Sequence, residues 1–192
     1  MIHILNLGWG NLESFQRFIL KLGYLAKILT LSEINFKAKY NTPLIIPGIG
    51  SAKKFNDLSE KDRFVLNRIL SETKCVIGVC LGSHLLCGRS DEGGMGVGMV
   101  GTDIMRFKNH IPNIGYVKVT YANEEYIIYH CHNYFIPKIP STVSGNFENE
   151  EFYTTIAEIN NMTLIQGHPE KSGEDGERLI KCVLRNHGVF HP

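Results

Sequence analysis

The stretch that decides the fold of this chain is Cys75-Val76-Ile77-Gly78-Val79-Cys80-Leu81-Gly82, an apolar run that ends in a cysteine between two glycines. This is the pattern of a nucleophile elbow, in which a strand turns sharply into a helix and the strained backbone leaves room only for glycine on either side. Cys80 would lie at a helix N-terminus, which favours the thiolate, and the backbone N–H of Leu81 would point to where an oxyanion forms. The pattern alone also fits a buried, inert cysteine on a tight turn.

A second cluster, Gln166-Gly167-His168-Pro169-Glu170, directly follows the apolar run 162–165. Alternation along an extended segment would place His168 and Glu170 on one face, so that the carboxylate can orient the imidazole while the imidazole takes a proton from a thiol. An isolated His-Pro-Glu would be read as an ordinary surface or core histidine. Because both clusters lie at strand ends, we predict that Cys80, His168 and Glu170 act together as nucleophile, base and orienting acid.

The apolar pattern around these clusters predicts an α/β fold with a mostly parallel open sheet flanked by helices, because apolar runs alternate with amphipathic helices. Strands are predicted at 2–7, 26–29, 44–46 and 75–79, and helices at 12–22, 62–71, 81–87 and 174–185. Further extended segments are predicted at 102–107, 117–121, 126–130, 141–147, 154–159 and 163–165. We expect these later strands to be antiparallel and to lie beside the parallel core.

Composition excludes several classes of protein. The 192 residues are 43% apolar and 20% charged, which fits a single domain over 1–192. The net charge is +1 and the basic residues are spread among acidic ones, so the sequence has no basic region of the kind that binds nucleic acid or a membrane surface. No apolar run reaches the length of a membrane span and no secretory signal is visible, so we expect a cytoplasmic enzyme.

The cysteines and histidines indicate no metal or disulfide framework. The five cysteines include no CxxC pair, so neither a disulfide set nor a zinc site is predicted. His130 and His132 flank Cys131, but this spacing lacks the second ligand pair that a metal site needs. We therefore expect no metal.

Taken together, these motifs resemble the class I, triad-type glutamine amidotransferases, and most closely the glutaminase subunits of imidazole glycerol phosphate synthases. The resemblance runs through almost the whole chain and is most specific at Gly167-His168-Pro169-Glu170-Lys171-Ser172-Gly173. The other matching segments are 1–4, 8–12 with Ser14, 47–50, the elbow, 90–94, 96–98, 106–107, 113–116 and 132–134. The resemblance implies a flavodoxin-like sheet, a Cys-His-Glu triad and no cofactor.

The resemblance also assigns a role to the glycine-rich segment Pro47-Gly48-Ile49-Gly50, which composition alone would make an ordinary loop after a buried strand. In the family this segment provides backbone N–H groups to the oxyanion, so Ile49 and Gly50 are expected beside Leu81 in an oxyanion hole. Two glycines would let the peptide flip. We therefore hypothesise that the hole is incomplete until a partner binds.

Substrate contacts follow from the resemblance position by position. Glu92 matches the glutamate that reads the α-amino group of glutamine, Asn133 and Tyr134 match a pair that offers backbone contacts, and Gly50 is expected to join them. His84 stands four residues past the nucleophile, where glutamine is usual. Because i and i+4 share a helix face, His84 can still approach the substrate or the thiolate.

Two other departures, Asn6-Leu7 in place of an acidic-aromatic pair and Tyr116 in place of tryptophan, fall in segments that bear on partner contact. The resemblance implies that glutamine is hydrolysed to glutamate and ammonia, and that the ammonia passes to a separate (β/α)₈ cyclase in a heterodimer that makes imidazole glycerol phosphate for histidine synthesis. One alternative is a paralogue that supplies ammonia for amination or amidination of a surface sugar. Alternatives of another class are a cysteine hydrolase and a catalytically inactive regulatory subunit.

Overall fold

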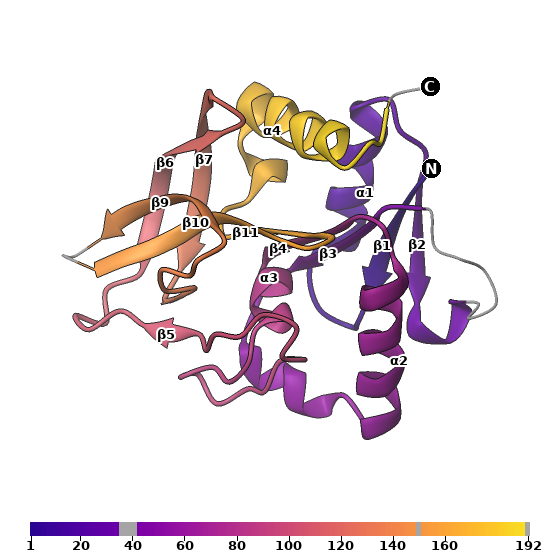
Figure 1. Ribbon diagram of the computed structural model, residues 1–192, viewed down its shortest axis with the longest axis horizontal. Helices are drawn as coiled ribbons and strands as arrows, with labels where there is room; N and C mark the ends of the chain where they lie inside the picture. The colour runs from indigo at the N-terminus through magenta and orange to yellow at the C-terminus, as the bar shows by residue number, and fades with distance from the viewer. Residues whose placement is uncertain (35–41, 149–150, 191–192) are drawn as a thin grey trace.

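A seven-stranded sheet with helices on both faces forms the centre of the molecule (Figure 1). The computed structural model describes residues 1–34, 42–148 and 151–190. In sheet order the strands are β2 (Ala26–Thr30), β1 (Ile2–Asn6), β3 (Leu44–Gly48), β4 (Val76–Cys80), β11 (Met162–Ile165), β10 (Glu151–Ile159) and β9 (Thr142–Glu148). Two separate strand pairs are β5 (Met105–Arg106) with β8 (Tyr134–Phe135), and β6 (Asn113–Tyr121) with β7 (Glu124–His132). The helices are α1 (Leu12–Lys21), α2 (Glu60–Glu72), α3 (Leu81–Leu86) and α4 (Gly173–Asn186), with 3₁₀ turns η1 (Leu31–Glu33), η2 (Ala52–Asp57) and η3 (Pro169–Lys171).

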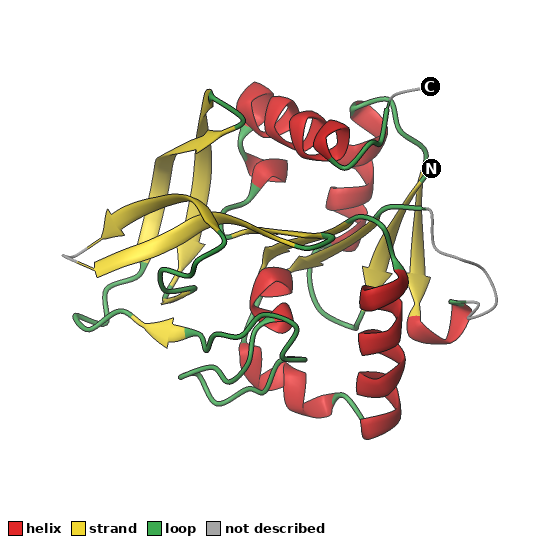
Figure 2. Ribbon diagram, viewed as in Figure 1, coloured by secondary structure: helices red, strands yellow, loops and turns green. Residues whose placement is uncertain are grey.

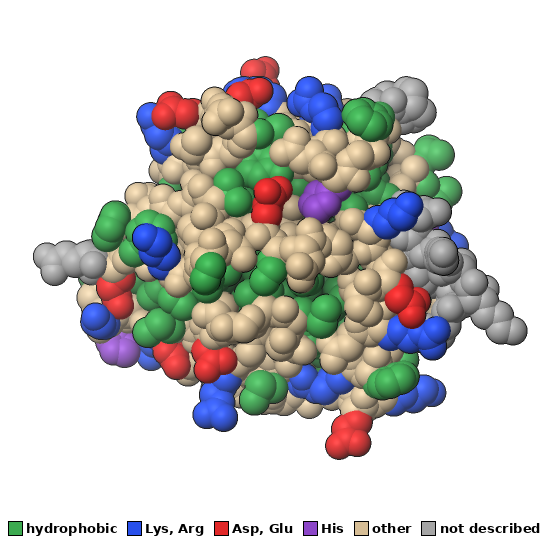
Figure 3. Space-filling model, in the orientation of Figure 1, with side chains coloured by type: hydrophobic (Ala, Val, Ile, Leu, Met, Phe, Trp, Pro, Cys, Tyr) green, Lys and Arg blue, Asp and Glu red, His purple; other side chains and the backbone are tan. Residues whose placement is uncertain are grey.

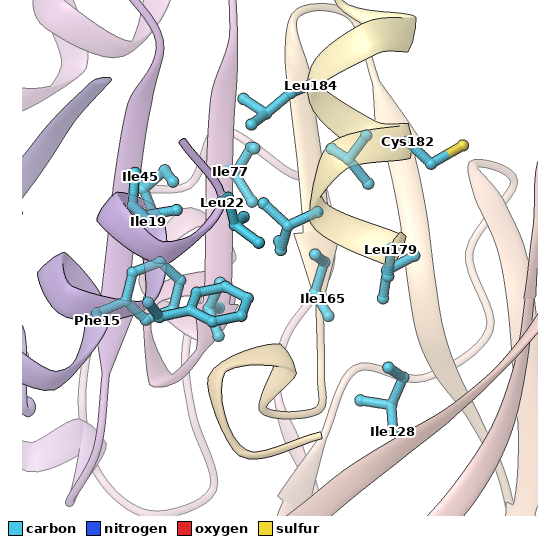
Figure 4. Packing of buried hydrophobic residues seen from close by; sticks show 14 of the residues in the cluster. Phe15, Ile19, Leu22, Ile45, Ile77, Ile128, Ile165, Leu179, Cys182 and Leu184 are labelled. Carbon is cyan, nitrogen blue, oxygen red and sulfur yellow. The ribbon is translucent and has the colours of Figure 1, made fainter. Parts of the chain in front are cut away.

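Helices α1 and α4 cover one face of the sheet, and α2 and α3 cover the other (Figure 2). Side chains of successive strand residues alternate between these two layers, which is why Ile45 packs with α1 and α4 while its neighbours Leu44 and Ile46 pack with α2 and α3. All five residues of β3 and of β4 are buried. Figure 4 shows Ile45 of the sheet beside Ile19 of α1, with Ile77 and Ile165 nearer to α4. The predicted α/β class with a mostly parallel sheet is confirmed.

One predicted strand direction is wrong. The segment 163–165 was expected among the antiparallel strands beside the core, but β11 pairs parallel with β4 and antiparallel with β10, so it lies inside the main sheet. A short apolar run carries no period that reveals the direction of its neighbours. The strands β9 and β10 are antiparallel as predicted, but they extend the main sheet. Within 102–107 only Met105–Arg106 forms a strand, because the backbone of Thr102 and Ile104 bonds to the loop at 88–91.

The carboxyl ends of β3, β4 and β11 meet at one edge of the sheet, since these strands run parallel in adjacent positions. In open α/β sheets this edge is where ligands bind. The hairpin β6–β7 reaches the same edge, because β7 forms an isolated bridge between Tyr129 and His168 just past β11. The sheet therefore places the two sequence clusters side by side.

The surface shows no concentration of one charge on the face drawn in Figure 3, where basic and acidic side chains are interspersed. This agrees with the net charge of +1. Within the described ranges, no helix is long and apolar enough to cross a membrane.

Candidate active site

Cys80 is the last residue of β4 and caps the N-terminus of α3 with φ of 52° and ψ of −114°. A positive φ is strained for a residue with a side chain, and such strain is typical of nucleophile elbows. The flanking glycines allow close packing: a Cβ on Gly82 would lie 1.7 Å from the carbonyl oxygen of Ile46, and one on Gly78 would lie 2.8 Å from Cα of Ser83. The predicted strand–turn–helix at Cys80 is thus present.

His168 lies between Cys80 and Glu170. Its Nδ1 is 2.9 Å from Oε1 of Glu170, and the two side chains are 3% and 7% exposed. Burial alone would lower the pKa of His168, but the hydrogen bond and negative charge of Cys80, followed by those of Glu170, raise it to about 10. Because Nδ1 is engaged by Glu170, Nε2 is the nitrogen left for Cys80. The structure therefore brings the three predicted residues together, with His168 in contact with both Cys80 and Glu170.

The contact between His168 and Glu170 arises in a different way from the one predicted. Glu170 does not continue an extended segment; it lies in the 3₁₀ turn η3, which starts with Pro169 directly after His168. The turn is closed by Ser172, whose hydroxyl donates to the carbonyl of His168 at 2.7 Å and accepts from the N–H of Tyr129 at 2.9 Å. The N–H of His168 donates to the carbonyl of Tyr129 at 2.7 Å. Strand β7 therefore holds the histidine in place.

A pocket of about 170 Å³ opens over Cys80 and His168. Its other lining residues are Ile49, Gly50, Leu81, His84, Glu92, Cys131, His132, Asn133, Tyr134 and Lys171. Every site residue predicted from the sequence lines this pocket except Glu170, which bonds to the far side of the His168 ring. The pocket is about the size that a small amino acid needs, and its walls come from five segments, 49–50, 80–84, residue 92, 131–134 and 168–171.

The loop that follows β3, residues 49–51, forms the wall expected to receive an oxyanion. Ile49 is 39% exposed, and Gly50 has φ of 118° with no atom within 4 Å of where a Cβ would be. Among the described residues, the N–H of Gly50 has no hydrogen-bond partner. Leu81 is the first residue of α3, where backbone N–H groups point outward from the helix. Donors from Gly50 and Leu81 thus border the pocket from two sides of Cys80.

His84 and Glu92 form the polar wall opposite. His84 Nε2 lies 2.9 Å from Oε1 of Gln166, and burial lowers the pKa of His84 to about 4 despite the opposing effects of that hydrogen bond and of Glu92. His84 is therefore neutral, and its Nδ1 is the ring nitrogen not used by Gln166. Glu92 Oε2 accepts a hydrogen bond from the N–H of Ala52 at 2.6 Å. Both side chains line the pocket as predicted, but the sequence does not predict their hydrogen bonds to Gln166 and Ala52.

The wall formed by Asn133 and Tyr134 is fixed through its carbonyl groups. The carbonyl of Asn133 accepts from the N–H of Phe107 at 3.3 Å. The carbonyl of Tyr134 is 3.0 Å from Nδ1 of His132. Since a carbonyl can only accept, His132 carries its proton on Nδ1.

His130 and His132 form a buried pair, of which His132 lines the pocket, and the sequence predicts no functional role for either. Nε2 of His132 is 3.2 Å from Nδ1 of His130. Burial lowers the pKa of His130 to about 3 and that of His132 well below its ordinary value. Residues 130 and 132 are two apart on β7, so both rings lie on the same inward face of the strand, and this spacing could have predicted that they are buried together. Across the described part of the chain, no group of three or more His, Cys, Asp or Glu side chains is arranged to hold a metal ion.

Comparison with known proteins gives a consistent result over nearly the full length. A family model described as glutamine amidotransferase class-I matches residues 3–185. The imidazole glycerol phosphate synthase subunit HisH of Buchnera aphidicola is 31% identical, covering 95% of this chain and 98% of the relative. HisH 2 of Methanococcus maripaludis is 33% identical, with 96% and 99% covered, and HisH of Staphylococcus aureus is 32% identical, with 96% and 97% covered.

Solved structures share the fold at lower sequence identity. A structure described as a glutamine amidotransferase superposes with a TM-score of 0.76 at 14% identity, covering 98% of this chain and 100% of that one. PurLQS from Thermotoga maritima superposes with a TM-score of 0.71 at 15% identity, covering 96% and 97%. At these identities the likeness concerns the fold.

Proposed function

Because the chain belongs to the class-I glutamine amidotransferase family, we propose that it hydrolyses glutamine through a thioester on Cys80, as the glutaminase subunit of an imidazole glycerol phosphate synthase. The observation that supports this proposal is that one pocket is lined by Cys80, His168, Glu92 and Gly50, whose N–H has no hydrogen-bond partner among the described residues. Such a pocket offers a nucleophile, an acid–base group, an anion for an α-ammonium and donors for an oxyanion. These are the groups that amide hydrolysis of an amino acid needs.

In the first half of the proposed reaction the Cys80 thiolate attacks the side-chain carbonyl carbon of glutamine. The carbonyl electron pair moves to oxygen, and this oxyanion accepts hydrogen bonds from the N–H of Leu81 and from the 49–51 loop. When the tetrahedral species collapses, the carbon–nitrogen bond breaks and the His168 imidazolium gives its proton to the departing nitrogen. Ammonia leaves, and the γ-glutamyl group remains on sulfur as a thioester.

In the second half, neutral His168 takes a proton from water, and the resulting hydroxide attacks the thioester carbon. Collapse breaks the carbon–sulfur bond, which regenerates the thiolate and releases glutamate. Glu170 accepts the Nδ1 proton of His168 in a hydrogen bond throughout, so it fixes the tautomer and stabilises each imidazolium. The imidazolium is the resting state, as the raised pKa of about 10 for His168 indicates.

Ammonia is useful to a synthase only if it is passed on before it is protonated in bulk water. We propose that a (β/α)₈ synthase subunit covers the mouth of the pocket in a heterodimer. The outer face of the β6–β7 hairpin is suited to this contact, because Ile114, Tyr116 and Ile127 are 60%, 67% and 44% exposed. The hairpin is also tied to the site, since Tyr116 packs against Tyr129 with ring centroids 5.6 Å apart, and the carbonyl of Tyr129 accepts the N–H of His168 at 2.7 Å.

The ammonia acceptor depends on the partner. The alternative proposed from the sequence, amination or amidination of a surface sugar, uses the same glutaminase chemistry. Two departures from the family pattern lie on the surface where they can alter partner choice: Tyr116 is exposed on the hairpin, and Asn6 lines a separate pocket at the end of β1. A cyclase of the histidine pathway and a sugar-modifying partner should therefore be compared directly.

The test is glutamate release from glutamine by the purified chain, alone and with each candidate partner. Wild type should hydrolyse glutamine much faster with its partner, and Cys80→Ala should abolish the reaction, whereas Cys131→Ser serves as the control for the other thiol of the pocket. Full activity without a partner would contradict the incomplete oxyanion hole. Alkylation of Cys80 by iodoacetamide without any glutamine hydrolysis would favour a different cysteine hydrolase, and a stable complex without hydrolysis would favour an inactive regulatory subunit.

A further inference from the structure

Glu92 connects two walls of the pocket that are 40 residues apart in the sequence. Its Oε2 accepts the N–H of Ala52 at 2.6 Å, and Ala52 is the first residue of η2, directly after the 49–51 loop. A carboxylate accepting a backbone N–H is a charge-assisted hydrogen bond, which is stronger than a neutral one. The group expected to read the substrate ammonium therefore also holds one end of the loop expected to receive the oxyanion.

The 49–51 loop is fixed at both ends but open between them. At its upstream end Gly48 packs so closely on α3 that a Cβ there would lie 2.6 Å from the N–H nitrogen of Gly82. At its downstream end the peptide of Ala52 is enclosed by the 92–94 segment, because a Cβ on Gly94 would lie 1.8 Å from the carbonyl oxygen of Ala52. Between these points Gly50 has open space around its Cα and an N–H without a partner within the described chain. The position of the loop is therefore set by its two anchors.

The backbone that carries the Glu92 carboxylate is held by several hydrogen bonds. The N–H of Glu92 donates to Oγ of Ser90 at 3.2 Å, and the N–H of Gly93 donates to the carbonyl of Ser90 at 2.8 Å. Asn56 of η2 adds a second tie to this segment, donating from Nδ2 to the carbonyl of Gly93 at 2.9 Å. The backbone of Glu92 is thus fixed next to η2, and its Oε2 is engaged by the N–H of Ala52, which leaves Oε1 for a substrate ammonium.

We infer that Glu92 is a positioning residue for the oxyanion loop as well as a ligand for the substrate ammonium, an inference that rests on the proposed glutaminase function. One oxygen holds Ala52 and thereby aims the N–H of Gly50, while the other faces the pocket. Recognition of the amino acid and stabilisation of the transition state are thus properties of one carboxylate. The two roles are separable, because an amide oxygen can replace the acceptor without replacing the charge.

The kinetic test compares Glu92→Gln with Glu92→Ala in the active complex. Glu92→Gln keeps an acceptor for Ala52 but loses the charge, so KM for glutamine should rise about tenfold or more while kcat stays within about threefold of wild type. Glu92→Ala loses both, so kcat should fall about tenfold or more in addition, because the oxyanion donors are displaced. Asn56→Ala, which removes the neighbouring tie to Gly93, is the control for general loosening of this segment and should keep kcat. Equal kcat values for the two Glu92 variants would overturn the inference.

A second measurement does not depend on activity. In ¹⁵N-labelled protein, the Ala52 amide should exchange with solvent about tenfold faster or more in Glu92→Ala than in wild type, and the Gly50 resonance should shift, whereas Glu92→Gln should preserve both. Unchanged Ala52 and Gly50 amides in Glu92→Ala would refute the positioning role even if glutamine hydrolysis is confirmed. Conversely, if no partner elicits hydrolysis from wild type, the proposed function fails while the amide exchange still decides how the loop is held.

Discussion

Gly167 has no side chain, and this allows β7 to pack closely on the backbone just before His168. A Cβ at this position would lie 2.6 Å from Cγ2 of Ile128 and 2.7 Å from Nε2 of His130. Strand β7 therefore packs straight onto the backbone of Gly167, and the imidazole of His130 occupies the volume that a side chain there would need. Because the next residue, His168, is bonded to β7 through its own N–H, a displacement at Gly167 would move the His168 ring relative to Cys80.

We predict that Gly167→Ala lowers both stability and glutaminase activity. Overpacking of this kind costs about 1–3 kcal/mol in the free energy of unfolding, and kcat should fall because His168 shifts. Urea unfolding and glutamate release measure the two effects. Gly101→Ala is the matched control, since nothing lies within 4 Å of a Cβ there. Adding His130→Ala to Gly167→Ala should recover part of the loss by restoring room; failure to recover any of it would show that the His130 contact is not the cause.

Motif spacing predicts single residues better than it predicts their partners. Cys80, His168 and Glu170 could be found because each lies in a short local pattern. The bond from His84 to Gln166 spans 82 residues, and that from Glu92 to Ala52 spans 40. A single sequence, considered without an alignment, contains no pattern that predicts such distant pairs. Even the local contact between His168 and Glu170 forms in a 3₁₀ turn, because proline at the first turn position fixes φ in the helical range.

At the level of elements, the junction between β7 and η3 sets the position of His168. The hydroxyl of Ser172 bridges the two, donating to the carbonyl of His168 and accepting from the N–H of Tyr129, and the reciprocal bond from His168 to Tyr129 completes the contact. Ser172 is buried, and its hydroxyl is hydrogen-bonded to both segments within the protein. The hairpin that carries the proposed partner surface is therefore bonded directly to the proposed acid–base group.

We predict that Ser172→Ala destabilises the protein by about 1–3 kcal/mol, because it leaves the part-buried N–H of Tyr129 without its acceptor and removes one of the two hydrogen bonds to the carbonyl of His168, which keeps the one from the N–H of Lys171. The value of kcat should fall more than KM rises, since the His168 backbone loosens while the substrate walls stay intact. Ser172→Thr, which keeps the hydroxyl, should retain more activity than Ser172→Ala. Ser71→Ala removes an exposed hydroxyl bonded to Arg68 on α2 and should leave both quantities near wild type; a similar loss in that control would contradict a specific role for the bridge.

The predicted elements differ from the observed ones where tertiary pairing decides the outcome. The amphipathic helices and the first four strands can be predicted from local periodicity. Each helix buries one apolar stripe, and buried strands appear as short apolar runs. The direction of β11 cannot, since its four buried residues would fit either direction of pairing. In the structure β11 runs parallel to β4 on one side and antiparallel to β10 on the other. The oxyanion role of the 49–50 segment was predicted from the family resemblance, and the structure places this segment beside Cys80 because β3 and β4 are adjacent and parallel.

Across the whole molecule, the interior around the site contains three histidines in an uncharged form. Burial lowers the pKa of His84 to about 4, that of His130 to about 3 and that of His132 well below its ordinary value. Each ring has at least one hydrogen-bond partner inside the protein. In the unfolded chain these rings would take up protons near their ordinary pKa of about 6.5. Folding therefore becomes less favourable as acid is added.

We predict that the free energy of unfolding falls steeply from about pH 7 to about pH 5. The unfolded chain binds more protons than the native one between the ordinary histidine pKa and about 4, so stability is lost as pH falls through this window, and His84 alone should account for about 2 kcal/mol. His84→Gln cannot titrate and should reduce the difference between urea-derived free energies at the two pH values by that amount. His110→Asn, at an exposed histidine, is the control; equal pH dependence in His84→Gln and wild type would show that His84 is not held neutral in the native protein.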